Sequence, residues 1–140
     1  MIRNERQYRI TNAQAERFME ALRALESRPK DDPLCQIERA ALQSQLDELR
    51  EELKAYDRLR SGRQRTLAVN SFDDLPRALV QARIAAGLSQ KELAERLRLK
   101  EQQIQRYEAT DYATASLTRL RKVMAALGVT FRGRVASLGQ

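Results

Sequence analysis

Three polar residues, Gln102, Gln105 and Arg106, have types and spacing that suit a defined chemistry. At about 100° per residue along a helix, Ile104 and Tyr107 share an apolar side, and these three residues face away from it. A glutamine amide can make two hydrogen bonds to the edge of adenine, and an arginine guanidinium can do the same with guanine. The spacing therefore predicts one short helix that presents base-reading side chains together.

Other kinds of chemistry lack the residues that they need. The chain has no histidine and a single cysteine, Cys35, which argues against Cys/His zinc sites, histidine-dependent catalysis and an intrachain disulfide. No glycine-rich phosphate loop is present, and the carboxylates have helix-surface spacings. Cys35 is better explained as a half-buried small side chain than as a reactive thiol. We expect no enzyme activity, no cofactor and no metal site.

Two short helices joined by a tight turn are needed to position the polar side chains. Ser89 is a suitable N-cap for the first, and Glu92 completes a capping box. Ala94 falls where the two helices approach most closely, so a larger side chain there would push them apart. The pattern predicts a helix-turn-helix over residues 90–109, with apolar contacts from Leu93, Leu97, Leu99, Ile104 and Tyr107.

The stretch over residues 87–108 resembles the Cro/C1-type (Xre-like) helix-turn-helix family of phage repressors and bacterial regulators. The resemblance covers residues 75–130 and extends to the flanking helices. The matching residues are Leu79, Arg83, Ala86, Gly87, Leu88, Ser89, Gln90, Leu93, Ala94, Leu97, Leu99, Ile104, Glu108, Leu117, Leu120, Leu127, Gly128 and Val129.

The resemblance also implies roles for individual residues. Base contacts are expected at Glu101, Gln102 and Arg106, and Glu101 either accepts from a cytosine amino group or merely favours the helix N-terminus. Gln90 occupies the position that anchors a phosphate in this family. The phosphate-binding residues predicted in full are Gln90, Arg98, Lys100 and Tyr112.

The turn departs from the family pattern at one position. Arg98 stands where the family usually has glycine, and a left-handed backbone costs a non-glycine residue on the order of 1 kcal/mol. The sequence leaves two alternatives open: a non-standard turn, or a strained Arg98 that brings its charge near a phosphate.

The N-terminal part reads as two helices. Thr11 and Gln14 have the spacing of a capping box, which predicts a first helix that starts at Thr11 and stops near Ser27. Asp32 is the predicted N-cap of a second helix that runs to about Arg60. That helix carries a heptad seam of Leu42, Leu46, Leu49, Leu53 and Tyr56.

A long helix with a narrow apolar seam needs a partner helix along its length. The first helix can cover part of the seam, and self-association of two chains through residues 34–60 would cover the remainder. We therefore predict that the five seam residues mediate a homodimer. The alternative is an intramolecular hairpin that uses the whole seam within one chain.

Charge divides the chain unevenly. Residues 1–60 carry 12 Lys/Arg and 12 Asp/Glu, whereas residues 61–140 carry 14 and 7, so the net charge of +7 lies in the second part.

We expect an all-α protein with a hairpin over 1–60, a linker over 61–72, a DNA-binding domain of four to five helices over 73–130, and a tail over 131–140. Asp73 or Asp74 should cap the first helix of the domain. The tail around Val129, Phe131 and Val135 forms a short strand or frays.

These features predict a sequence-specific, homodimeric transcription regulator of double-stranded DNA, acting as a repressor at an inverted-repeat operator. The hairpin ahead of the domain is similar in architecture to some HigA-type antitoxins, in which case a toxin protein is a further partner. The alternative function is a protein-interaction module whose hairpin is the working surface.

No apolar run reaches membrane-spanning length, and no signal-peptide core is present, so we expect a soluble, cytoplasmic protein.

Overall fold

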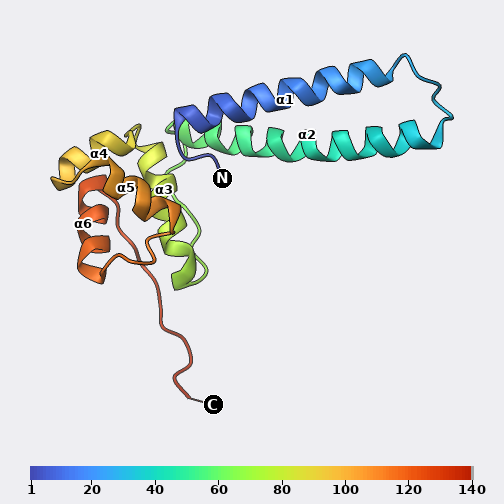
Figure 1. Cartoon of the computed structure of the whole chain (residues 1–140). Coiled ribbons are helices and arrows are strands. Elements are labelled where there is room, and N and C mark those ends of the chain that lie inside the picture. The colour runs from blue at the N-terminus through green and yellow to red at the C-terminus, as the bar shows by residue number, and fades with distance from the viewer. Residues whose placement is uncertain (140) are drawn as a thin grey trace. The chain divides into compact units, whose positions relative to one another are not determined.

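The computed structural model describes residues 1–139 and divides the chain into two compact units, Met1–Arg65 and Thr66–Gln140. Regular structure in the described residues is entirely helical (Figure 1), which confirms the expected all-α class. None of the helices over residues 1–139 is long and apolar enough to cross a membrane. Each unit has its own core.

The first unit is an antiparallel hairpin of α1 (Glu5–Leu25) and α2 (Pro33–Arg60). The expected start of α1 at Thr11 is wrong, because Asn4 is the N-cap and accepts a hydrogen bond from the Gln7 backbone N–H at 2.9 Å. Thr11 therefore lies inside the helix, where a capping role is not available. The expected start of α2 is confirmed: Asp32 accepts from the Leu34 backbone N–H at 3.0 Å, and Pro33 opens the helix.

The heptad seam of α2 packs against α1 of the same chain. Leu46 is 1% exposed and Tyr56 is 7% exposed, and the rings of Tyr56 and Tyr8 lie 5.3 Å apart. The remaining seam residues, Leu42, Leu49 and Leu53, are half-buried. Cys35 is buried with them and is 1% exposed. The seam thus serves the intramolecular hairpin, and Leu46 and Tyr56 are not free to form a dimer surface while α1 is in place.

The open end of the hairpin is held by a cluster around Arg60. Its guanidinium lies over the rings of Tyr8 and Tyr56, at 5.0 and 5.4 Å from their centroids, and pairs with Glu5 at 2.7 Å. The Tyr8 hydroxyl donates to Asp57 at 3.2 Å. These contacts join the first turn of α1 to the last turn of α2 and fix the register of the hairpin.

The second unit begins with an irregular segment over residues 66–70 and the short 3₁₀ helix η1 (Phe72–Asp74). Four helices follow, as the sequence predicts: α3 (Leu75–Ala85), α4 (Gln90–Leu97), α5 (Glu101–Ala109) and α6 (Leu117–Leu127). Asp74 does not cap α3 with its side chain; its carboxylate accepts instead from the Asn70 and Ser71 backbone N–H groups. The side chains buried between the four helices include Leu79, Val80, Ile84, Leu93, Ile104, Leu120 and Val123.

The chain beyond α6 has no regular secondary structure over residues 129–139. Gly128 ends α6 in the left-handed region, with φ 67°, which suits a glycine. The tail forms no strand within the described residues of this chain. Phe131 is 44% exposed and Val135 is 86% exposed.

Candidate nucleic-acid interface

The crossing of α4 and α5 is built from small and fully buried side chains. Leu93 and Ile104 are 0% exposed and Ala94 is 1% exposed, so the two helices meet along this line. Ser89 caps α4 by accepting from the Glu92 backbone N–H at 3.0 Å, and Glu92 accepts in return from the Ser89 N–H at 3.3 Å. This is the capping box expected from the sequence.

The turn between the two helices adopts the left-handed conformation at Arg98, with φ 56° and ψ 41°. The Leu99 N–H donates to the Ala94 carbonyl at 2.8 Å, and the Arg98 N–H donates to the Glu95 carbonyl at 3.1 Å. These two hydrogen bonds are those of the Schellman motif that ends many helices. Of the two alternatives at this position, the structure shows the standard turn, with Arg98 accepting the backbone strain.

The recognition candidates lie together on the outer side of α5. Glu101, Gln102, Gln105 and Arg106 are all exposed, whereas Ile104 on the opposite side is fully buried. The Gln105 amide donates to the Glu101 carboxylate at 3.4 Å, one turn away on the same side. The Gln103 side chain accepts from the Lys100 backbone N–H at 3.0 Å and thereby satisfies the start of the helix.

Among the predicted phosphate contacts, the structure separates two exposed residues from two buried ones. Arg98 and Lys100 are exposed beside the turn. Tyr112 is 3% exposed and its ring stacks on Tyr107, with centroids 5.5 Å apart. Burial raises the pKa of the Tyr112 phenol far above its usual value, so its hydroxyl stays protonated. Gln90 is 8% exposed, and the burial of Gln90 and Tyr112 gives no support to a phosphate contact by either.

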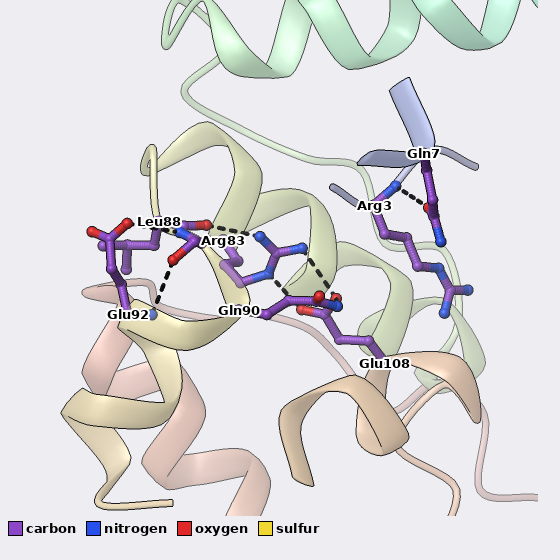
Figure 2. Close-up of polar contacts among 8 residues, drawn as sticks. Arg3, Gln7, Arg83, Leu88, Gln90, Glu92 and Glu108 are labelled. Atoms are coloured by element: carbon purple, nitrogen blue, oxygen red, sulfur yellow. Dashed lines mark hydrogen bonds and ion pairs between the residues drawn. The ribbon is translucent and has the colours of Figure 1, made fainter. Parts of the chain in front are cut away.

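A buried polar network fixes the orientation of α5 (Figure 2). Arg83 of α3 and Glu108 of α5 are 2% and 1% exposed and form a two-point ion pair. Gln90 at the start of α4 donates its amide to Glu108 at 2.8 Å, and Arg83 also donates to the Leu88 carbonyl at 2.7 Å. The network thus ties α3 and α4 to the carboxylate at the far end of α5. Such a charge pair adds geometric precision because both groups are satisfied.

Sequence reasoning did not assign a role to this network, although a signal is present. Glu108 follows Ile104 by four residues, so it falls on the buried side of α5, where a lone carboxylate is costly. Arg83 lies in an equally apolar stretch between Val80 and Ile84. Two opposite charges on two buried helix sides are the pattern of an internal ion pair.

The comparisons with known proteins agree with this geometry. The helix-turn-helix family model matches residues 79–133, which run from within α3 to the start of the tail. No curated protein and no solved structure matches the chain. Residues 79–133 therefore form a helix-turn-helix domain of the Cro/C1 (Xre-like) type, the kind of domain that DNA-binding transcription regulators carry.

Proposed function

We propose that the protein is a repressor that binds an inverted-repeat operator as a homodimer and reads each half-site with α5. The observation that carries this proposal is the exposed group formed by Glu101, Gln102, Gln105 and Arg106. These side chains stand opposite the fully buried Ile104, on a helix whose far end is anchored by Glu108. A short rigid helix with amide and guanidinium groups on its free side suits the major groove of B-DNA.

Within this group, each side chain suits one kind of base contact. Arg106 can make two hydrogen bonds to guanine, and Gln102 can make two to adenine one turn away. Glu101 holds the Gln105 amide at 3.4 Å, which limits the directions in which Gln105 can point toward a base. Arg98 and Lys100, beside the turn, are suited to the sugar–phosphate backbone, where a contact carries no sequence information.

The proposed reading is tested by titrating operator and scrambled duplexes at three salt concentrations. Gln102→Ala or Arg106→Ala should each cost roughly 1–3 kcal/mol on the operator and little on scrambled DNA, because base-edge contacts exist only on the correct sequence. Lys100→Ala is the control in the same structure. It should weaken binding to both duplexes about equally and lower the salt slope by about one.

Equal losses on both duplexes for the Gln102 and Arg106 variants would show that α5 does not read sequence. In that case the alternative function, a protein-interaction module that works through the hairpin, is favoured. An antitoxin role requires a toxin partner, and nothing in the described residues favours a toxin over a second copy of the chain. The operator itself is obtained by selecting bound duplexes from a random pool with the full-length chain.

A further inference from the structure

The two long faces of the α1–α2 hairpin differ in character. One face carries the polar contacts that join the helices: Tyr8 to Asp57 at 3.2 Å, and Arg50 to the Met19 sulfur at 3.2 Å. The ion pair of Arg60 with Glu5 lies on the same side. We call this the polar face. Helical periodicity adds the exposed residues Arg9, Glu16, Arg23, Ala40, Asp47 and Lys54 to it.

The opposite face carries fewer charges and several exposed apolar groups. Ile10 of α1 is 57% exposed, and Leu34 of α2 is 59% exposed, with Ile37 at its edge 67% exposed. Helical periodicity places them with small and uncharged side chains. We call it the Ile10–Leu34 face; its members are Ile10, Gln14, Arg17, Ala21 and Ala24 from α1, and Leu34, Glu38, Ala41, Gln45, Glu48 and Glu52 from α2.

The seam residues are consistent with a partner on this face. A pair of helices forms a single layer, which leaves its seam half-covered: Leu42, Leu49 and Leu53 are only half-buried, although they point toward α1. A second layer of helices on one face would complete their burial and cover Ile10 and Leu34 as well. Alanines at this face allow the close approach that a helix layer needs.

The charges on the face select the partner and its direction. The basic residue of the face, Arg17, comes from α1, whereas Glu48 and Glu52 come from α2. The third acid, Glu38, pairs with Arg28 at 3.0 Å. Placing α1 of one copy on α2 of another therefore sets Arg17 against the two glutamates at the same level, whereas placing α2 on α2 sets glutamates from both copies in one interface.

We propose that a second copy of the chain packs on the Ile10–Leu34 face, with α1 of each copy lying on α2 of the other. The result is a four-helix bundle whose two-fold axis runs parallel to the helices, so both α2 helices end at the same end of the bundle. This inference rests on the homodimer in the proposed function. It moves the dimer surface from the leucine seam, which α1 occupies, to the exposed face beside it.

Two adjacent alanines give a matched test. Ala41 lies on the Ile10–Leu34 face and Ala40 on the polar face, and both are exposed in the same helix. Ala41→Asp should raise the dimer dissociation constant at least tenfold in sedimentation equilibrium, because it buries a carboxylate between the layers. Ala40→Asp should change the dissociation constant less than about threefold, because Ala40 lies on the polar face. The two substitutions alter helix propensity equally, so they are a matched pair. Circular dichroism of both variants checks that the hairpin is retained.

A charge-reversal cycle tests the direction of packing. Arg17→Glu and Glu48→Arg should each weaken the dimer about tenfold, and the double variant should recover most of the loss. Arg9→Glu, on the polar face, is the control and should leave the dissociation constant within threefold. No recovery in the double variant would overturn the placement of α1 on α2.

Other outcomes separate this inference from the proposed function. A wild-type chain that stays monomeric at tens of micromolar, or equal effects of Ala40→Asp and Ala41→Asp, would overturn the inference. Sequence-selective binding to a single half-site is measured independently on the same variants. If Ala41→Asp is a monomer that still prefers the half-site over scrambled DNA, both the inference and the DNA-reading role stand. If the wild-type chain binds the half-site and scrambled DNA equally well, that result would instead contradict the proposed function.

Discussion

At the scale of single residues, the buried ion pair between Arg83 and Glu108 joins α3 to α5 in the DNA-binding domain. Both side chains are nearly inaccessible to water, and the carboxylate also accepts the Gln90 amide at 2.8 Å. A buried charge is tolerated because every one of its hydrogen-bonding partners is supplied by the protein. The pair therefore acts on DNA binding indirectly, by setting where α5 lies.

Glu108→Gln tests this role with little change of shape. The substitution removes the charge that compensates the buried guanidinium, so the free energy of unfolding should fall by about 3–5 kcal/mol. Urea titration followed by circular dichroism measures the change. Glu101→Gln, at the exposed start of the same helix, is the matched control and should cost less than about 0.5 kcal/mol. A loss below about 1 kcal/mol for Glu108→Gln would show that the buried pair contributes little to stability.

At the scale of elements, the α4–α5 turn combines a strained backbone with an exposed cation. Arg98 has φ 56°, a conformation in which an L-residue other than glycine crowds its own Cβ. Leu97 ahead of it and Leu99 after it are half-buried, so the turn cannot relax without disturbing the crossing. The strain is therefore maintained by the packing on both sides of the turn.

Arg98→Gly should relieve this strain and stabilise the domain by about 1 kcal/mol. For a domain of this size, such a gain corresponds to a rise of about 4–8 °C in Tm, which calorimetry detects. Arg98→Ala is the control, because alanine also has a Cβ and should give no such gain. Both substitutions should weaken binding to operator and scrambled DNA equally if Arg98 contacts a phosphate. A glycine variant no more stable than the alanine variant would argue against strain at this position.

At the scale of the whole molecule, one helix-turn-helix domain contacts few base pairs, so specificity is expected to come from two domains. Half-sites about 34–36 Å apart, or a multiple of that spacing, match successive turns of the same DNA face. A dimer joined through the hairpins links the second binding event to the first, which raises overall affinity without new contacts.

Inserting about five base pairs between the half-sites should lower affinity at least tenfold, because half a helical turn moves the second site to the opposite side of the duplex. Inserting about ten base pairs is the control and should recover part of the loss, since it restores the helical phase. Gel-shift titrations of the three duplexes give the comparison. Equal affinity for all three would indicate that each domain binds independently of the other.

What the sequence determined by itself was local. The limits of the helix-turn-helix, the Ser89 cap and the Asp32–Pro33 start of α2 each depend on residues within about four positions, where periodicity and capping act. The first turn of α1 was misjudged because Thr11 and Gln14 have the spacing of a capping box, whereas the cap is Asn4, a better N-cap residue type that lies earlier in the chain. The family match over residues 79–133 follows from the same local patterns.

Only the tertiary structure decided which of these residues are buried and against what. Arg83 and Glu108 are 25 residues apart, and their pairing follows from how α3 packs on α5. Gln90 and Tyr112 read as polar surface residues in sequence, yet both lie inside because neighbouring helices cover them. From the sequence, the seam of α2 could pack on a second chain or on α1 of the same chain. In the structure α1 packs on it. Burial depends on distant segments, and their approach is a property of the packed chain rather than of any short pattern.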